Sequence, residues 1–397
     1  MKKSLLIFLS TFLLGVVGII MIYSASNIWS SYRFNDPNHY VKHQALFFLI
    51  GLFTIYILSK IDYKIYKKHA SKILLLSLIL LILVLIPGIG QVRNGSRSWF
   101  GIGAFGIQPS ELSKLALIIF TAKYLSNHEK ETKSFKKGIM PILLIIFLFF
   151  GLIMLEPDFG TGMVIVMSLM FMLFITNAKL TFFAIIGILG LCGITGLIII
   201  APYRLARILS FLNPWSDPLG SGFQIIQSLY AIGPSGLFGK GFGNSIQKHF
   251  YLPEPQTDFI FAIISEEFGF IGILVIASLF LTLFYNTLKV SLECKDLFGK
   301  YLSFGLVISL ILQAVLNISV VIGLVPVTGV TLPFLSYGGS SLLVSMASVG
   351  IILNIAKESN KYLQKQKVGA KRSKHFWKDL KIRENFIKKL TQNYFLW

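Results

Sequence analysis

Long apolar segments, separated by short polar loops, occupy most of the chain. A membrane-spanning helix needs about 20 consecutive, mainly apolar residues. The first segment follows Met1-Lys2-Lys3, but no convincing small-residue cleavage site comes after it, so we expect a mature helix there rather than a signal peptide. The pattern predicts ten spanning helices, at approximately residues 4–24, 44–59, 73–88, 110–126, 139–155, 161–177, 181–201, 260–288, 301–325 and 337–356.

The composition narrows the class of protein. Hydrophobic residues make up 54% of the 397 residues and charged residues 14%, whereas an average soluble domain has about 25% charged residues. This excludes a disordered chain, a disulfide scaffold and a typical cytosolic enzyme. We expect an all-α integral membrane protein with one ten-helix domain over residues 1–357 and a basic cytoplasmic tail over residues 358–397. The two cysteines suggest neither a disulfide nor a metal site.

The distribution of positive charge predicts the orientation. The net charge of +20 comes from Lys and Arg clusters between apolar segments, most of them in the loops on the side of the N-terminus. The positive-inside rule then places both termini in the cytoplasm, which agrees with an even number of helices. We interpret the charge as topological and as a contact with anionic lipid headgroups at the cytoplasmic face, not as a nucleic-acid signature. The long loop over residues 202–259 is therefore expected outside.

The stretch before the eighth segment offers the first candidate for chemistry. Pro253 and Pro255 prevent a continuous helix, and Asp258 follows where the chain enters the membrane. A carboxylate partly desolvated by Phe259 would have a raised pKa and would accept a proton more readily. The alternative is that Asp258 caps the helix. Glu254, in the same stretch, is a candidate substrate contact.

Two other charged pairs suit an anionic ligand. Arg204 and Arg207 lie three residues apart and suit a pyrophosphate, although an arginine pair also anchors helices at a lipid interface. Glu111 and Lys114 form an i, i+3 pair at the start of the fourth segment. Charges within a membrane are costly, so either the two neutralise each other or Lys114 points at an anionic ligand.

Three polar loops have simpler interpretations. Asp158, in the turn after the fifth segment, is favoured as a structural residue, with binding of Mg²⁺ or Mn²⁺ as the alternative. Ser340 opens the last segment among small residues, which favours helix packing over ligand approach. Residues 236–243 lack the spacing of a phosphate-binding loop, so we interpret them as flexible loop backbone.

Taken together, the motifs resemble those of the SEDS family, the shape, elongation, division and sporulation proteins of bacteria. The resemblance covers approximately residues 10–357, and Phe250-Tyr251-Leu252-Pro253 is similar to the FtsW/SpoVE branch rather than the RodA branch. Gln256 stands where many members have His. The motifs that carry the resemblance are Gln108-Pro109-Ser110-Glu111, Glu156-Pro157-Asp158, Asn213-Pro214-Trp215, Thr257-Asp258-Phe259 and Leu332-Pro333-Phe334.

The resemblance implies an inverting peptidoglycan glycosyltransferase in the bacterial cytoplasmic membrane. Such enzymes polymerise lipid II into β-1,4 glycan strands on the outer face, for cell division or spore cortex synthesis. The essential acid of the family matches Asp258, its cavity charges match Glu111 and Lys114, and its arginines match Arg204 and Arg207. The implied partners are lipid II, a class B penicillin-binding protein and other divisome or sporulation membrane proteins. No cofactor is certain.

Two alternatives remain, a lipid II flippase and a noncatalytic divisome scaffold. A flippase needs polar groups distributed over both faces, whereas the polar motifs here concentrate on the expected outer side. A scaffold would tolerate replacement of Asp258. The end of the chain, from about Lys371 to Trp397, has no counterpart in the family. It suits either a basic helix on the inner leaflet or a solvated tail.

Overall fold

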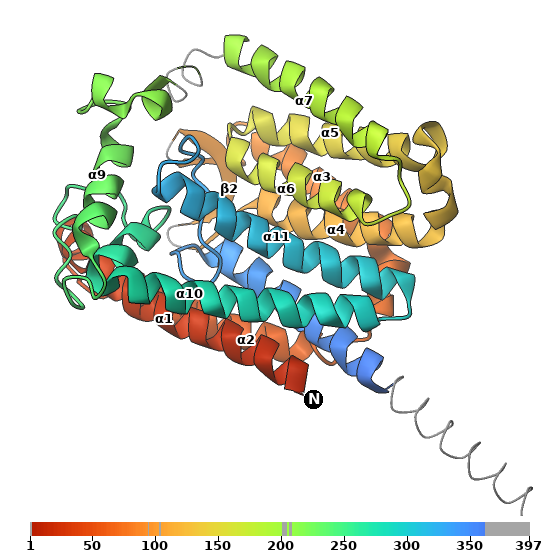
Figure 1. Ribbon diagram of the computed structural model, residues 1–397, viewed down its shortest axis with the longest axis horizontal. Coiled ribbons are helices and arrows are strands. Elements are labelled where there is room, and N and C mark those ends of the chain that lie inside the picture. Colours follow the sequence, from red (N-terminus) through yellow and green to blue (C-terminus); the bar gives the residue numbers. More distant parts are fainter. Residues whose placement is uncertain (1, 94, 103–104, 201–204, 206–208, 362–397) are drawn as a thin grey trace, which may run out of the picture.

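The structure is a computed structural model, and it describes residues 2–361 apart from 94, 103–104, 201–204 and 206–208. Most of the described chain is helical (Figure 1). The long helices are α1 (Lys2–Phe34), α2 (His39–Leu58), α3 (Lys64–Leu85), α4 (Pro109–Asn127), α5 (Met140–Leu155), α6 (Phe159–Phe174), α7 (Leu180–Ile200), α10 (Ile260–Glu293), α11 (Leu297–Val321) and the helix Gly339–Lys361. The shorter ones are η1 (Glu129–Lys133), η2 (Phe135–Ile139), η3 (Pro214–Ser216), α9 (Phe223–Ile232) and η4 (Gly233–Ser235).

Seven of the described helices are long and apolar enough to cross a membrane. They are α1, α2, α3, the helical stretch Phe135–Leu155, α10, α11 and Gly339–Lys361. The other three predicted segments overlap α4, α6 and α7. Large apolar side chains such as Leu5, Phe53 and Leu281 remain 63%, 64% and 65% exposed. In water this would be costly, so these faces are suited to lipid and the chain is a multi-pass integral membrane protein.

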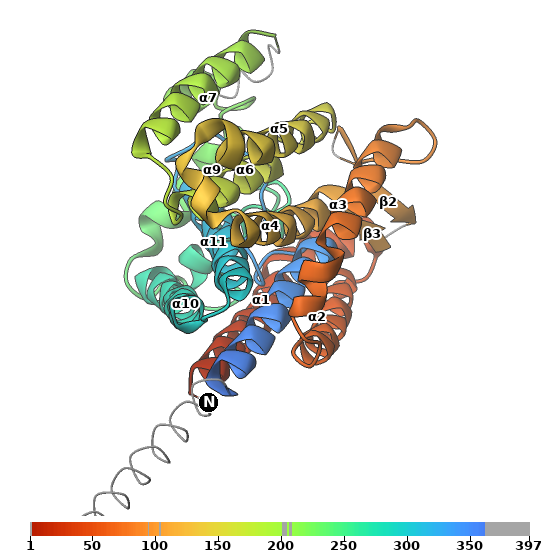
Figure 2. The ribbon, with the colours of Figure 1, turned by 90° about the vertical axis from the view of Figure 1, so that its right-hand side faces the viewer.

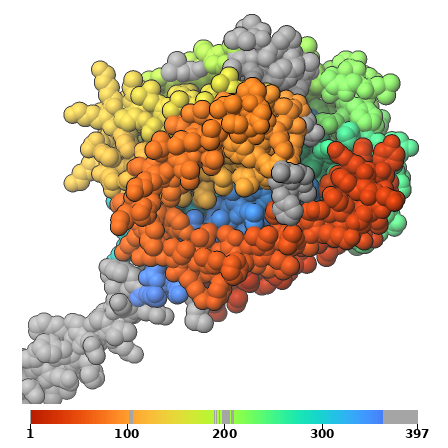
Figure 3. Space-filling view, turned by 180° about the vertical axis from the view of Figure 1, so that it is seen from behind, coloured from red at the N-terminus to blue at the C-terminus, as the bar shows by residue number. Residues whose placement is uncertain are grey.

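The helices form a bundle with two central members. Of the 18 most apolar consecutive residues in each helix, 83% are buried in Gly339–Lys361 and 67% in α11, against 22% in α3 and in α10. Helix α11 packs against α4, α6 and α10, and α10 packs along α1 (Figures 1 and 2). Seen from behind, residues near the end of the described chain (blue) lie between the orange and red surfaces of its first hundred residues (Figure 3). Helix α7 lies at the edge of the bundle (Figure 1).

A small antiparallel sheet stands at one end of the bundle, between the third and fourth helices predicted from the sequence. Its strands β1 (Gln91–Arg93), β2 (Ser96–Ile102) and β3 (Phe105–Ile107) are ordered β1-β2-β3. The Ser96 hydroxyl donates a hydrogen bond to the carbonyl of Glu156. The sheet is thereby attached to the turn between α5 and α6.

Helix α10 is interrupted, although the sequence predicted one continuous helix. Gly269 has φ 62° and ψ −156°, a conformation outside the helical region. The backbone N–H groups of Phe270 and Ile271 donate to the carbonyls of Gly236 and Leu237, at 3.0 and 3.1 Å. At membrane depth a helix break is tolerated only when other groups satisfy the backbone, and this loop supplies them.

The same loop also satisfies the carbonyls before the break. The N–H groups of Lys240 and Gly241 donate to the carbonyls of Glu266 and Glu267, both at 2.9 Å. A Cβ added to Gly239 would come within 2.4 Å of the Glu267 backbone. The segment interpreted from sequence as flexible backbone is therefore packed into the break and bonded on both sides of it.

Candidate functional site

Asp258 lies two residues before α10 and is half-buried. The N-cap of α10 is Phe259, so Asp258 lies one position before the residue that begins the helix. The Asp258 carbonyl accepts a hydrogen bond of 2.7 Å from Nδ2 of Asn317. A Cβ added to Gly329 would lie 3.7 Å from Oδ2 of Asp258, which places the carboxylate beside the loop between α11 and Gly339–Lys361.

The chain leading to Asp258 is held on both sides. The carbonyl of Glu254 accepts bonds from the N–H and the hydroxyl of Thr257, at 3.1 and 2.8 Å, which closes a turn. The carbonyl of Gln256 accepts a 2.8 Å bond from the N–H of Tyr337. Beyond Asp258, Phe259 is 2% exposed and anchors the chain in the core. The backbone therefore fixes the direction from which the Asp258 carboxylate projects.

Glu111 and Lys114 lie in the first turns of α4 and form the expected pair. Lys114 Nζ lies 2.8 Å from Oε2 of Glu111, and both side chains are buried. The ammonium also donates a 2.5 Å hydrogen bond to Oε1 of Gln313 on α11. The neutralising interpretation is therefore correct for this conformation. The cation nevertheless belongs to a polar cluster that reaches across two helices.

Two side chains that we did not single out in the sequence connect this cluster to Asp258. Gln313 and Asn317 lie four residues apart in α11, and each is 1% exposed. Gln313 contacts Lys114, and Asn317 contacts Asp258. The sequence feature that could have pointed to them is a pair of carboxamides at helical spacing in an apolar segment. Such groups are rarely buried without hydrogen-bond partners, so each one indicates a polar neighbour.

Asp158 takes the structural role that the sequence favoured. Its Oδ1 accepts a 3.2 Å bond from the N–H of Thr161 and caps α6. Its Oδ2 accepts bonds from Nε2 of Gln108 and the hydroxyl of Ser110, at 2.9 and 3.1 Å. Burial raises the pKa of Asp158. Within the part of the chain that the structure describes, no three His, Cys, Asp or Glu side chains are arranged to hold a metal ion.

Glu156, two residues earlier, is fully buried. Neither of its carboxylate oxygens has a hydrogen-bond partner among the described residues. Burial, with the nearby charge of Asp158, raises the pKa of Glu156 to about 9. Burial therefore favours the neutral form of the Glu156 carboxyl.

Ser340 also packs rather than pointing into open space. Its hydroxyl donates a 2.8 Å bond to the carbonyl of Gly106 and accepts a 3.1 Å bond from the N–H of Gln108. It thereby joins β3 and the start of α4 to the helix Gly339–Lys361. Arg204 and Arg207 lie outside the described residues, as does the tail beyond residue 361.

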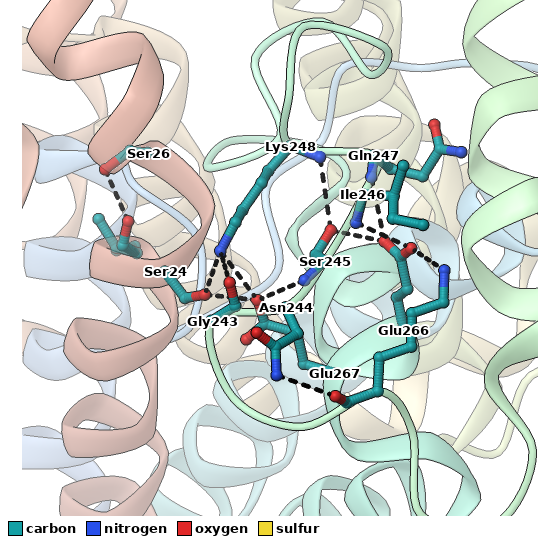
Figure 4. Close-up of polar contacts among 12 residues, drawn as sticks. Ser24, Ser26, Gly243, Asn244, Ser245, Ile246, Gln247, Lys248, Glu266 and Glu267 are labelled. Atoms are coloured by element: carbon teal, nitrogen blue, oxygen red, sulfur yellow. Dashed lines mark hydrogen bonds and ion pairs between the residues drawn. The ribbon is translucent and has the colours of Figure 1, made fainter.

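A second polar cluster, which sequence reasoning missed, surrounds two adjacent glutamates of α10 (Figure 4). Glu266 is fully buried and accepts four hydrogen bonds from the loop before α10. Its partners are Nζ of Lys240 at 2.7 Å, the hydroxyl of Ser245 at 2.5 Å and the N–H groups of Ile246 at 3.0 Å and Gln247 at 3.3 Å. One carboxylate thus holds the whole turn over residues 240–247. Two consecutive acids within an apolar segment were the signal.

Glu267, next to it, faces α1. Oε1 of Glu267 accepts a 2.5 Å bond from the hydroxyl of Ser24 and lies 3.4 Å from Nζ of Lys248. The Lys248 ammonium also donates a 2.5 Å bond to the carbonyl of Gly243 (Figure 4). Burying two carboxylates is costly unless cations and hydrogen bonds compensate them, and this cluster provides both.

The comparisons with known proteins show the family and the fold. A family model described as "Cell cycle protein", covering FtsW, RodA and SpoVE, matches residues 4–361. Stage V sporulation protein E of Bacillus subtilis is 51% identical over 358 residues, which are 90% of this chain and 98% of that protein. A probable peptidoglycan glycosyltransferase FtsW of Geobacter is 41% identical, over 89% of this chain and 96% of the relative.

Two solved structures share the fold. One, from work on polymerisation and crosslinking by a peptidoglycan synthase complex, has a TM-score of 0.74 at 29% identity and covers 89% of this chain and 97% of its own. The crystal structure of the rod shape-determining protein RodA of Thermus thermophilus has a TM-score of 0.64 at 25% identity, over 89% and 96%. The fold and site thus define a polytopic membrane protein of bacterial cell-wall synthesis. The chain belongs to the FtsW/RodA/SpoVE family.

Proposed function

We propose that this protein polymerises lipid II, a disaccharide-pentapeptide on undecaprenyl pyrophosphate, into β-1,4 glycan strands on the outer face of the membrane. The observation that carries the proposal is the position of Asp258. Its half-buried carboxylate lies at one end of α10, and α11 connects its backbone to the buried cation Lys114. A carboxylate base and a cation that contact the same helix suit a displacement with an anionic leaving group.

The proposed topology has ten membrane helices with both termini in the cytoplasm. It adds α4, α6 and α7 to the seven helices that qualify by length and composition. The loop between α7 and α10 and the three-stranded sheet then lie outside, at the end of the bundle that holds Asp258. The excess of Lys and Arg in the opposite loops supports this orientation. Residues 1–357 form the membrane domain, and residues 358–397 a basic cytoplasmic tail.

In the proposed reaction Asp258 is the general base. The acceptor hydroxyl of N-acetylglucosamine is a poor nucleophile, and the carboxylate removes its proton as the new C–O bond forms. The bond between the anomeric carbon and the pyrophosphate oxygen breaks in the same displacement. One displacement inverts the α-linkage of the donor to the β-linkage of the product, as in inverting glycosidases.

The leaving group is a pyrophosphate on which negative charge accumulates. In the proposal Lys114 stabilises this charge, together with Arg204 and Arg207, which match arginines of the family. Glu111 keeps the cation paired when substrate is absent, and Glu254 is a proposed substrate contact. The donors around Asp158 are an amide, a hydroxyl and a backbone N–H, which do not fit a Mg²⁺ or Mn²⁺ site, so no step is assigned to a metal ion at Asp158.

A class B penicillin-binding protein, which crosslinks the strands, is the proposed partner, with other divisome or sporulation membrane proteins. A similar solved structure concerns a peptidoglycan synthase complex that coordinates polymerisation with crosslinking, and this similarity supports a partner of that kind. The higher identity to a sporulation protein favours spore cortex synthesis over vegetative division.

The test is polymerisation of labelled lipid II by the purified full chain with its penicillin-binding protein. Asp258→Asn is the test variant. Asp217→Asn is the matched control, because Asp217 lies in the same loop but is exposed, and its carboxylate bonds locally to Ser221, at 2.7 and 3.0 Å. We expect long glycan strands from the wild type and from Asp217→Asn, and none from Asp258→Asn. Circular dichroism and partner capture confirm that each variant is folded.

Other outcomes would contradict the proposal in distinct ways. Equal product from wild type and Asp258→Asn would remove Asp258 from the mechanism. No product from the wild type would favour the flippase or the scaffold. A lipid II translocation assay in vesicles then separates these two.

A further inference from the structure

Helix α11 presents two buried carboxamides on one face. Gln313 and Asn317 are four residues apart, so their side chains lie one above the other. Each is 1% exposed, in a helix that is otherwise mostly apolar. A buried carboxamide is costly unless it is hydrogen-bonded, and both of these make specific bonds.

Gln313 holds the cation on one side and a loop on the other. Its Oε1 accepts the 2.5 Å bond from Nζ of Lys114. Its Nε2 donates to the carbonyl of Thr331 and to the hydroxyl of Ser341, both at 3.1 Å. Because these two bonds fix the amide nitrogen of Gln313, they also fix the orientation of its carboxamide oxygen. This oxygen then holds the Lys114 ammonium in one position.

Asn317 holds the chain that carries the base. Its Nδ2 donates to the carbonyls of Asp258 and Val330, both at 2.7 Å. These two bonds join Asp258, two residues before α10, to the loop containing Gly329, which lies beside the Asp258 carboxylate. The first turn of α10 is closed by a bond from the N–H of Ala262 to the carbonyl of Phe259.

We propose that Gln313 and Asn317 are positioning residues, which set the placement of Lys114 relative to Asp258 through one turn of α11, about 6 Å along its axis. The inference rests on the proposed function. In that reaction the base acts at the attacking oxygen and the cation at the leaving group. The distance between base and cation must therefore match the distance between the attacking oxygen and the leaving group. An error of about 1 Å in this distance lowers the rate on the order of 10²-fold.

The two residues are expected to affect different kinetic constants. Asn317→Leu keeps the size of the side chain but releases the Asp258 carbonyl, so kcat falls on the order of 10²-fold while KM for lipid II changes less than about twofold. Gln313→Glu places a second carboxylate against Lys114 and weakens its attraction for pyrophosphate. KM then rises roughly tenfold, the effect of one lost charged hydrogen bond.

A matched control separates positioning from general packing. Asn354, on Gly339–Lys361, is 2% exposed and also joins two backbone groups, the carbonyl of Ser59 and the N–H of Tyr63, both at 3.0 Å. Asn354→Leu removes an equally buried carboxamide in a different part of the bundle. We expect Asn354→Leu and Asn317→Leu to lose similar thermal stability, and only Asn317→Leu to lose kcat.

The assay is glycan polymerisation with the full chain and its penicillin-binding protein, with wild type and Asp258→Asn alongside. Equal kcat for Asn317→Leu and Asn354→Leu overturns the inference while the proposed function stands. If Asn317→Leu does not fold, the Gln313→Glu measurement decides, and an unchanged KM overturns the inference. An inactive wild type, or an active Asp258→Asn, overturns the proposed function itself.

Discussion

The buried ion pair between Lys248 and Glu267 permits a quantitative prediction. Lys248 Nζ lies 3.4 Å from Oε1 of Glu267, and the two side chains are 3% and 0% exposed. The ammonium also donates to the carbonyl of Gly243 and, at 3.4 Å, to the hydroxyl of Ser24. Lys248→Met retains the length and apolar stem of the side chain, so the change removes mainly the charge.

The expected loss is large because the remaining carboxylate cannot reach water. Removing one member of a buried pair costs about 3–5 kcal/mol, most of it from the uncompensated charge. Lys240→Met should cost no more than about 1 kcal/mol, because the Lys240 side chain is 30% exposed and Glu266 keeps its other three donors. Adding Glu267→Gln to Lys248→Met removes the stranded charge and should restore about 1–3 kcal/mol.

Thermal unfolding in detergent, followed for wild type, both lysine variants, Glu267→Gln and the double variant, measures these differences. We expect Lys248→Met to be the least stable protein and the double variant to lie between it and the wild type. An additive loss in the double variant would refute the reasoning, since it would mean that the two side chains do not interact. Equal losses for Lys248→Met and Lys240→Met would refute the role of burial.

Three further predictions concern positions outside the proposed chemistry. Gly239→Ala should destabilise the protein by more than about 1 kcal/mol, because φ is 71° at this position and the new Cβ would overlap the backbone of Glu267. The control Gly233→Ala should leave the stability unchanged in the same thermal assay, because φ at Gly233 is helical and no atom lies near the new Cβ. Because folding raises the pKa of Glu156 from 4.5 to about 9, the stability of the wild type should fall as the pH rises through that window and level off above it. The Glu156→Gln variant should lack this fall. A wild-type stability that stays constant from pH 5 to 9 would contradict the burial of this acid. Asp158→Ala removes the cap of α6 and the acceptor for Gln108 and Ser110, so it should destabilise the protein by more than about 1 kcal/mol. Activity that is lost in this variant and restored by excess Mn²⁺ would instead support a metal site at Asp158.

The sequence alone was sufficient to predict a mostly helical, multi-pass membrane protein and to place Asp258 just before a long apolar helix. Each apolar segment specifies its own helix, because a backbone in lipid must satisfy its hydrogen bonds within the segment. The Glu111–Lys114 pair was also predictable, since i, i+3 spacing brings the two side chains together within one helix. Asp158 was interpreted correctly as structural, because a cap also depends on neighbours in the chain.

The bonds of α11 and the break in α10 were not predictable from the sequence, because they depend on contacts between segments that lie far apart in the chain. The bond from Asn317 to Asp258 joins residues 59 apart, and the bond from Lys114 to Gln313 joins residues 199 apart. The break at Gly269 was not predictable either, because it is stable only when the loop at residues 236–241 supplies the missing backbone partners. Local spacing and hydropathy in the sequence indicated which segments are apolar helices, which residues cap them and where the charged side chains lie. Only the packing of α11 between α4 and α10 decided which of those polar groups meet, because a buried polar side chain must bond to whatever the neighbouring helix presents.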